Sequence, residues 1–355
     1  MAAFAVFEWS SMVVLDASDS RLADLMQWVL EDLGMAGAAI APASADASFR
    51  RYFRVTRDSD TYIVMDAPPD KEDSAPFVKV ARLLGGMNLN VPTILARDMA
   101  RGFLLLSDLG SRQYLDALPE EGAADRLYTD ALASLRIMQT AEARASQELP
   151  HYDRALLLRE MQLLPEWFLT RHLALNIDAH ERTMLEQLFD SLVGSAVSQP
   201  AVFVHRDYHS RNLLVTPQHN PGILDFQDAV WGPVTYDLAS LLKDCYIAWP
   251  PARVRDWALA YRENLLATGF PLNATAAQFI RWFDLMGLQR HIKVLGIFAR
   301  LFYRDGKSQY LRDLPRVLDY SRETASAYPE TQRFAEFIAK RIDPVFKNAQ
   351  ERVLT

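Results

Sequence analysis

The residues best suited to chemistry stand in one short stretch in the second half of the chain. His205 and Asp207 follow a run of apolar residues, and Asn212 comes five positions after Asp207. A second carboxylate, Asp225, lies thirteen positions beyond Asn212. The order His-x-Asp, four spacer residues, Asn and a further Asp is typical of a loop that transfers a phosphoryl group.

Each of these side chains has a role in such a transfer, because the transition state is loose and highly charged and the protein mainly positions groups and supplies cations. Asp207 is placed to hold an acceptor hydroxyl and to take its proton late. Asn212 and Asp225 offer the hard oxygen ligands that Mg²⁺ prefers. His205 is expected to orient the loop by hydrogen bonding. We therefore predict Mg²⁺ as cofactor and ATP as phosphate donor, with GTP as the alternative.

A metal-dependent hydrolase is the rival interpretation of the same stretch. On an extended strand His205, Asp207 and His209 would face one way and could bind zinc or iron, with Asp225 or Asp228 completing the site. Four further histidines stand in helical or turn contexts without ligand spacing, namely His151, His172, His180 and His219. This scarcity of ligands favours phosphoryl transfer.

Length and composition set the frame for these residues. A chain of 355 residues is too long for one small core and short enough for two lobes. The formal charge of -7 argues against a protein that coats nucleic acid or an anionic membrane. A single cysteine, Cys245, excludes an internal disulfide and fits a reducing compartment, so we expect a cytoplasmic protein. Residues 1–16 lack a basic region and carry Glu8, which indicates a disordered leader rather than a signal.

The pattern over residues 17–108 predicts a small β-rich lobe. Leucines and other apolar residues at helical spacing after Asp19 predict a capped helix over 20–33. Aromatic and β-branched residues around the turn 58–60 predict a hairpin of 47–55 with 61–65. A helix over 75–84 and strands at 91–93 and 102–106 complete the expected lobe.

From residue 109 to 355 the pattern predicts a mainly helical lobe that contains the stretch from His205 to Asn212. Apolar stripes with a period near 3.6 residues predict helices over 122–143, 154–173 and 180–196. The loop itself is expected between short strands at 201–204, 213–215 and 223–224. The chain turns helical again from Asp237, with breaks near residues 250, 270 and 305. The predicted fold class is α+β, with two lobes.

Three linked motifs carry a resemblance to a known family: His205 to Asn212, then Leu224 to Asp228, then the run Gly232 to Ala239 (GPVTYDLA). Together they resemble the aminoglycoside phosphotransferase and choline kinase superfamily, which has a bilobal protein-kinase-like fold. The resemblance implies that Asp207 is the catalytic base and that Asn212 and Asp225 are the magnesium ligands. It also implies that Asp237 is a buried carboxylate that braces the catalytic loop.

Longer strings are similar to a narrower group, the bacterial anomeric sugar kinases of peptidoglycan recycling. They are HRDYHSRNLLV, GILDFQDAVWGPVTYDLASLLKDCYIAWP and LQRHIKVLGIFARLFYRDGK. The resemblance implies phosphorylation of the C1 hydroxyl of N-acetylmuramate and N-acetylglucosamine. Its product would feed a uridylyltransferase, which is expected only as a pathway neighbour. An aminoglycoside, a choline-like alcohol or another sugar remains open as acceptor.

The predicted nucleotide-binding residues differ from those of the superfamily in one respect. Its members carry a lysine on the third strand of the small lobe, whereas the corresponding run Tyr62 to Asp66 has no basic residue. Arg50, Arg51 and Arg54 on the preceding hairpin are candidate replacements, and Arg51 is our choice. The Ser48 hydroxyl and nearby backbone amides could cradle phosphate. We assign two further contacts at the junction of the lobes, Ser107 and Leu109. The missing lysine also leaves open a pseudokinase that binds nucleotide without turnover.

The acceptor side is predicted from a basic concentration late in an acidic chain. Its members are Arg290, His291, Lys293, Arg300 and Arg304. Such a patch would repel a polycationic aminoglycoside and attract the lactyl carboxylate of N-acetylmuramate through an arginine fork. The predicted substrate contacts are Arg290 and Arg300, joined by Asp228 and His209 next to the loop.

Overall fold

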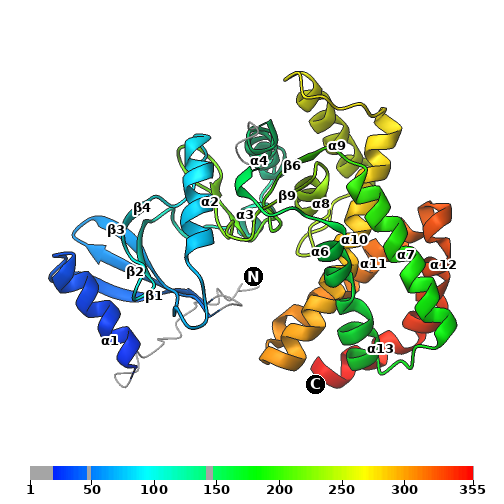
Figure 1. Cartoon of the computed structure of the whole chain (residues 1–355), viewed down its shortest axis with the longest axis horizontal. Coiled ribbons are helices and arrows are strands. Elements are labelled where there is room, and N and C mark those ends of the chain that lie inside the picture. Colours follow the sequence, from blue (N-terminus) through cyan, green and yellow to red (C-terminus); the bar gives the residue numbers. More distant parts are fainter. Residues whose placement is uncertain (1–18, 46–48, 141–146, 355) are drawn as a thin grey trace, which may run out of the picture. The chain divides into compact units, whose positions relative to one another are not determined.

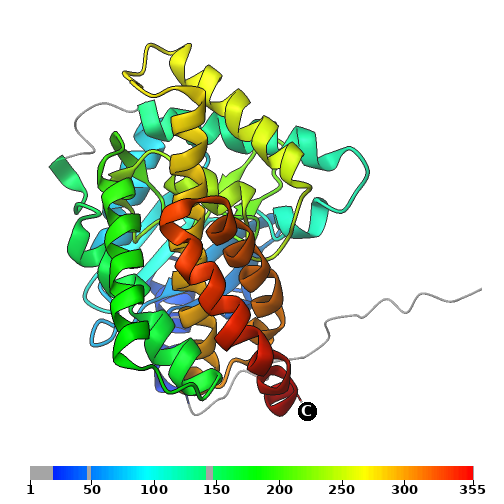
Figure 2. The same ribbon diagram turned by 90° about the vertical axis from the view of Figure 1, so that its right-hand side faces the viewer.

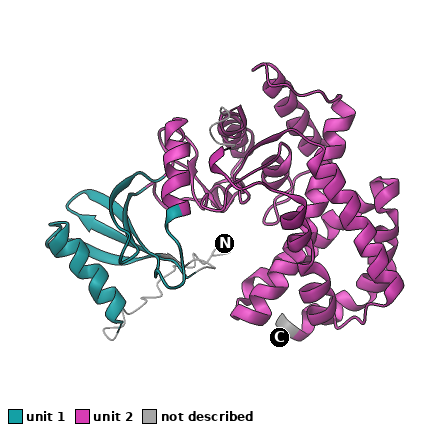
Figure 3. Cartoon of the chain, in the orientation of Figure 1, with its two compact units in different colours: residues 1–75, 92–108 teal, residues 76–91, 109–355 magenta. Residues whose placement is uncertain are grey.

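The computed structural model describes residues 19–45, 49–140 and 147–354. Its contacts divide the chain into two compact units, residues 1–75 with 92–108 and residues 76–91 with 109–355 (Figure 3). The sequence analysis places the 75–84 helix in the first lobe, whereas the structure assigns most of it to the second unit. The reason is packing, because the ring of Phe77 lies 4.9 Å from that of Phe226.

The first unit is built on a five-stranded antiparallel sheet of order β1-β2-β3-β5-β4. Its strands are β1 (Ala39–Ala45), β2 (Arg51–Arg57), β3 (Asp60–Asp66), β4 (Ile94–Asp98) and β5 (Phe103–Ser107). The predicted hairpin is confirmed as β2 and β3, whose turn holds Asp58 at a φ of 54°. The alanine-rich β1 has no alternating apolar pattern, which is why sequence analysis misses it.

One helix covers this sheet. The predicted helix over 20–33 is confirmed as α1 (Ser20–Gln27), which continues in a π-helical turn, Trp28–Asp32. Asp19 caps it by accepting hydrogen bonds from two backbone N–H groups of the first turn. Leu25 and Val29 are fully buried in one apolar cluster with residues of β2, β3 and β5. Figure 1 shows α1 lying along the sheet.

The second unit is mainly helical and is organised around α10 (Ala276–Asp305). Figures 1 and 2 show α10 passing through the middle of this unit, with α7 (Ala179–Val197) on one side and α11 (Leu314–Ala327) on the other. A Cβ at Gly296 would collide with the backbone of Leu163, so this glycine lets the π-helix Leu164–His172 approach α10 closely. The remaining helices are α2 (Ala75–Gly86), α3 (Tyr114–Ala117), α4 (Ala123–Thr140), α6 (Arg154–Met161), α8 (Tyr236–Leu242), α9 (Pro251–Leu266), α12 (Gln332–Phe337) and α13 (Asp343–Leu354).

Two small antiparallel ladders hold the chemically interesting stretch inside this helical unit. β6 (Ala201–Val204) pairs with β9 (Val230–Pro233), and β7 (Leu213–Leu214) pairs with β8 (Gly222–Ile223). The loop 205–212 therefore leaves one ladder and enters the other. The α+β prediction, with a β-rich first lobe and a helical second one, is confirmed. Within the described parts of the chain, no helix combines the length and apolar character needed to cross a membrane.

Candidate active site

The start of the loop is fixed by one buried carboxylate from the next helix. Asp237, in the first turn of α8, accepts hydrogen bonds from the backbone N–H groups of His205 (2.6 Å) and Arg206 (3.0 Å). Burial raises the pKa of Asp237 to about 7, even though the two N–H groups and the charge of Arg290 favour the ionised form. Asp237 thus holds the backbone at the point where β6 ends.

Arg206 is locked from three sides. Its φ of 78° is unusual for a residue with a side chain, so surrounding contacts must maintain it. Asp237 binds its N–H, and the guanidinium of Arg290 donates to its carbonyl at 2.7 Å. Its own guanidinium forms an ion pair with Glu160 of α6 at 2.5 Å. The residue immediately before Asp207 is therefore held rigidly.

Asp207 follows at the bend of the loop, and its backbone is tied on both sides. Its N–H donates to Nδ1 of His205 at 3.3 Å, and its carbonyl accepts the side-chain amide of Asn212 at 3.0 Å. Burial alone would raise the pKa of Asp207, but positive charges led by Lys293 and joined by Arg290 lower it to about 2. Burial lowers the pKa of His205 to about 4, so that imidazole is neutral near pH 7. The backbone of Asp207 is therefore held in place, and nearby positive charges favour its ionised carboxylate.

Asn212 and Asp225 are brought together although thirteen residues separate them. The amide of Asn212 donates to Oδ2 of Asp225 at 3.2 Å, and Gln227 donates to Oδ1 at 2.6 Å. The backbone carbonyl of Asn212 also accepts the N–H of Leu224 at 2.9 Å. Asp225 adopts a φ of 62°, a conformation of the kind that recurs at functional sites. One carboxylate and one amide thus stand side by side near Asp207.

A buried ionic cluster lies behind the loop. Glu160 pairs with Arg206 and, at 3.1 Å, with Lys293 of α10, and it accepts the hydroxyl of Tyr152. Burial would raise the pKa of Glu160, but Lys293 and Arg206 hold it below its usual value. Sequence analysis misses Glu160. The available signal was its place on the apolar stripe of its helix, three residues after Leu157 and four before Leu164.

The predicted basic patch on α10 is not one surface. Arg290 and Lys293 are buried, 7% exposed each, and bind the loop and Glu160 rather than facing solvent. Arg304 pairs with its neighbour Asp305. Arg300 lies almost three turns beyond Arg290, where its charged neighbours are Arg304, Asp305 and Glu166. Arg290 and Arg300 thus lie far apart along α10, which runs through the interior of the unit, and their contact with the substrate stays a prediction.

The far side of the loop rests on a second buried carboxylate, which sequence analysis also misses. Asp244 accepts both the backbone N–H (3.0 Å) and the hydroxyl (2.5 Å) of Ser210. The ring of His209 meets Tyr246 edge to face, with centroids 5.3 Å apart. Asp228, the other predicted substrate contact next to the loop, is exposed, and its backbone carbonyl accepts a hydrogen bond from Arg206.

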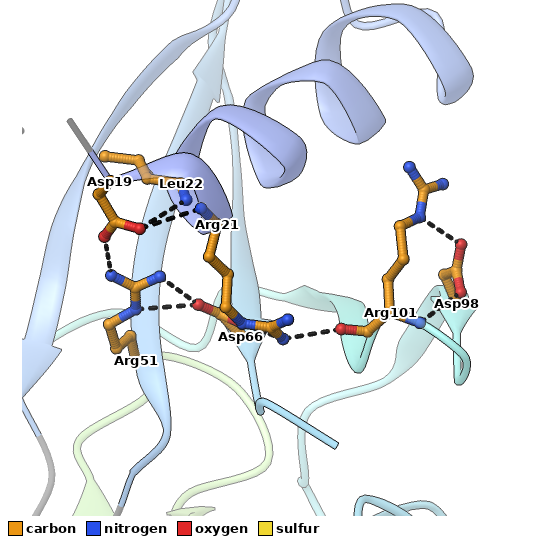
Figure 4. A network of polar contacts seen from close by, with 7 residues as sticks. All are labelled: Asp19, Arg21, Leu22, Arg51, Asp66, Asp98 and Arg101. Atoms are coloured by element: carbon orange, nitrogen blue, oxygen red, sulfur yellow. Dashed lines mark hydrogen bonds and ion pairs between the residues drawn. The ribbon is translucent and has the colours of Figure 1, made fainter. Parts of the chain in front are cut away.

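In the first unit, Arg51 is engaged by carboxylates. Its guanidinium forms ion pairs with Asp19, the cap of α1, and with Asp66 of β3 at 2.6 Å (Figure 4). Arg21 also reaches the fully buried Asp66. The same figure shows Arg51 lying between its two acidic partners. The arginine that sequence analysis selects for phosphate thus ties the first helix to the sheet in this structure.

The neighbouring candidates for nucleotide binding are also placed. Arg54 pairs with Asp108 at 2.6 Å, and Arg50 pairs with Glu72 at 3.1 Å. The hydroxyl of Ser107 accepts the N–H of Thr93 at 2.9 Å. Leu109 belongs to the second unit, where it adjoins Gly222. Ser48 lies outside the described residues, as do residues 1–16.

The rival hydrolase site is not assembled. β6 ends at Val204, so His205, Asp207 and His209 lie on a bent loop rather than on one face of a strand. In the described ranges, no three side chains among histidines, cysteines, aspartates and glutamates converge to hold a metal ion.

Known proteins resemble this chain in sequence, and others resemble it in fold. Residues 39–272 match the phosphotransferase enzyme family. The N-acetylmuramate/N-acetylglucosamine kinase of Pseudomonas aeruginosa is 48% identical over 302 residues, which cover 85% of this chain and 88% of that protein. Its counterpart in Pseudomonas putida is 44% identical and covers 91% and 97%. An ethanolamine kinase of Plasmodium vivax superposes with a TM-score of 0.61 at 12% identity, covering 87% and 91%. The chain belongs to the phosphotransferase enzyme family.

Proposed function

We propose that this phosphotransferase moves the γ-phosphoryl group of ATP to the C1 hydroxyl of N-acetylmuramate and of N-acetylglucosamine. The observation that carries the proposal is that Asn212 contacts both the backbone carbonyl of Asp207 on the loop and the carboxylate of Asp225 beyond β8. The choice of acceptor is supported by two relatives that are named N-acetylmuramate/N-acetylglucosamine kinase. They are 48% and 44% identical to this chain over most of both proteins. An enzyme that transfers a uridylyl group to a sugar 1-phosphate is the expected consumer of the product.

Asp207 acts on the acceptor. With a pKa of about 2 it is fully ionised at neutral pH, and so weak a base does not deprotonate a free hydroxyl. We infer that it accepts a hydrogen bond from the C1 hydroxyl and aims an oxygen lone pair of that hydroxyl at phosphorus. It takes the proton late, when the forming bond has made the hydroxyl acidic. Such positioning suits a loose transition state.

Asn212 and Asp225 fit a magnesium ion. They offer an amide oxygen and a carboxylate on adjacent side chains, a donor set that Mg²⁺ uses together with phosphate oxygens and water. The ion, when bound, neutralises charge on the transferred phosphoryl group. Gln227 keeps the carboxylate of Asp225 oriented by donating to its second oxygen.

The first unit is proposed to bind the nucleotide through Ser48, Arg51 and Ser107, and Leu109 of the second unit stays a separate prediction from the sequence. Arg51 would have to share its charge between phosphate and the carboxylates of Asp19 and Asp66. Arg51→Gln separates two roles: a raised KM for ATP at unchanged melting temperature indicates a phosphate contact. A lowered melting temperature with unchanged KM indicates that the arginine only ties α1 to β3.

The decisive test offers the protein ATP, Mg²⁺ and a panel of acceptors: N-acetylmuramate, N-acetylglucosamine, kanamycin and choline. Phosphorus NMR should show a new phosphomonoester coupled to the anomeric proton of both amino sugars. Asp207→Asn should lower kcat by about 10²- to 10⁴-fold while the protein stays folded. Asp190→Asn, which alters an exposed ion pair with Arg154, is the matched control and should keep full activity.

Other results would redirect the proposal. Transfer to kanamycin or choline in place of the amino sugars would overturn the acceptor class. Nucleotide binding with no turnover on any acceptor would support the pseudokinase that the absent strand lysine allows.

A further inference from the structure

The loop 205–212 carries a second arginine besides Arg206. Arg211 stands between Ser210 and Asn212, four residues after Asp207. Its guanidinium lies 3.7 Å from the centroid of the Tyr246 ring and 5.9 Å from that of Tyr310. Phe298 of α10 packs on both tyrosines, with centroid distances of 6.1 and 5.3 Å. Arg211 is therefore held against an aromatic wall, and it is only partly buried.

The charge of Arg211 is not compensated by an ion pair within the described ranges. Two acids near this part of the chain bind other groups, although the charge of Arg211 also acts on Asp313. Asp244 accepts hydrogen bonds from Ser210 and Tyr246, and Asp313 pairs with Arg316 at 2.9 Å.

The other cations around Asp207 differ in this respect. Arg206 and Lys293 share the carboxylate of Glu160, and Arg290 is buried against the carbonyl of Arg206. Among these described cations, Arg211 differs in that its contacts are aromatic rings rather than a carboxylate or a carbonyl, and in that it is partly exposed to an incoming anion.

Stacking prepares this side chain for a particular kind of anion. A guanidinium that lies over a tyrosine uses its face, while its N–H donors point outward in the plane. Two of those donors match the two oxygens of a carboxylate in a bidentate pair. The ring of Tyr246 also removes rotational freedom from the arginine, which lowers the entropy cost of binding. A guanidinium held 3.7 Å from the ring centroid of Tyr246 is suited to act as a preorganised carboxylate fork.

We propose that Arg211 binds the lactyl carboxylate of N-acetylmuramate and so sets the preference for this sugar over uncharged N-acetylglucosamine. The inference rests on the proposed function. The C1 hydroxyl and the lactyl ether are carried by the same pyranose ring, so two residues four positions apart on one loop suit both. Arg211 replaces Arg290 and Arg300, which the sequence pattern favours, as the carboxylate contact.

The test measures how substitution of Arg211 changes the ratio of kcat/KM for N-acetylmuramate to kcat/KM for N-acetylglucosamine. For the whole protein and for Arg211→Gln and Arg211→Lys, kcat/KM is measured with N-acetylmuramate, with N-acetylglucosamine and with N-acetylmuramamide, whose carboxyl group is a neutral carboxamide. Arg211→Gln should lower the ratio of N-acetylmuramate to N-acetylglucosamine by about 10- to 100-fold, mainly through KM, because a charged hydrogen-bonded pair is lost. The carboxamide should cost the wild type a similar factor and cost Arg211→Gln almost nothing. Arg211→Lys, which keeps the charge without the fork, should fall in between.

Arg253→Gln is the matched control, because Arg253 also stacks on aromatic rings, Trp249 and Trp257, away from the loop. In Arg253→Gln the ratio of kcat/KM for N-acetylmuramate to that for N-acetylglucosamine should equal the wild-type ratio. If kcat/KM in Arg211→Gln falls by the same factor for both sugars, so that the ratio is unchanged, the role of Arg211 is overturned and the proposed function stays intact. A wild type that phosphorylates neither amino sugar would overturn both. Turnover of N-acetylglucosamine in the variants itself reports that they are folded.

Discussion

The carboxylate of Asp237 accepts the backbone N–H of His205 at 2.6 Å, across thirty-two positions of the chain. The second oxygen accepts the N–H of Arg206 at 3.0 Å, so both oxygens are used. In this way the helix that follows β9 holds the segment that leaves β6. The position of the loop 205–212 therefore depends on one buried carboxylate of α8.

Asp237→Asn should weaken this brace. An asparagine offers one acceptor oxygen, and its NH₂ group faces the second backbone N–H, so one buried donor loses its partner. We expect a loss of about 1–3 kcal/mol in the free energy of unfolding, measured by urea denaturation. We also expect a fall in kcat with little change in the KM for ATP. Unchanged kcat in a measurably destabilised variant would contradict a role in positioning the loop.

Glu160→Gln should destabilise the protein more strongly than most single substitutions. The change leaves Arg206 and Lys293 buried without their shared anion, and uncompensated buried charge costs roughly 3–5 kcal/mol. Chemical denaturation measures the loss. If the charge is the cause, adding Lys293→Met should recover part of it, because one buried cation is then removed. A double variant less stable than Glu160→Gln would show that packing around Lys293 matters more than its charge.

The stability of the protein should fall as the pH drops below about 6.5, because several histidines are buried in neutral form. Burial lowers the pKa of His291 to about 3 and that of His172 to about 4. The unfolded chain takes up these protons near pH 6.5 and the folded chain does not, so acid favours unfolding. Each histidine should contribute about 1.4 kcal/mol per pH unit between pH 6 and the folded pKa.

The variant His291→Gln checks this expectation. It removes one titrating ring that stacks on Tyr320, 4.8 Å between centroids. Free energies of unfolding measured from pH 5 to pH 8 should therefore depend less steeply on pH in the variant than in the wild type. Parallel curves would show that His291 contributes nothing to the acid sensitivity.

The sequence predicted the elements that carry strong local signals. The capped helix at Ser20, the hairpin around Asp58 and the strand into the loop at Val204 follow from periodicity and turn residues. The strand β1 was missed because its alanines and Pro42 give no alternating pattern. The boundary of the first lobe was placed without regard to Phe77, since a contact with Phe226, far along the chain, leaves no local signature.

For the candidate site, the order of residues along the sequence predicted which side chains belong to it, but not which other side chains they contact. Asp207, Asn212 and Asp225 are identified by their order, and the structure brings Asn212 and Asp225 into contact. Glu160 and Asp244 could not be assigned, because which buried cation or hydroxyl a carboxylate meets depends on the packing of distant helices. The burial of Arg290 and Lys293 could not be predicted for the same reason, because the place of a basic helix inside the unit depends on its packing against distant segments.

The dependence on magnesium should distinguish the two carboxylates of the site. Asp225→Asn removes a charged oxygen ligand from the pair with Asn212, so the Mg²⁺ concentration at half-maximal activity should rise by at least about tenfold. Asp207→Asn should lower kcat at every Mg²⁺ concentration and leave the half-saturation point in place, because Asp207 is assigned to the acceptor hydroxyl. The measurement is a Mg²⁺ titration at saturating ATP for both variants. If the half-saturation points of Asp207→Asn and Asp225→Asn shift equally, the division of labour between these two residues is wrong.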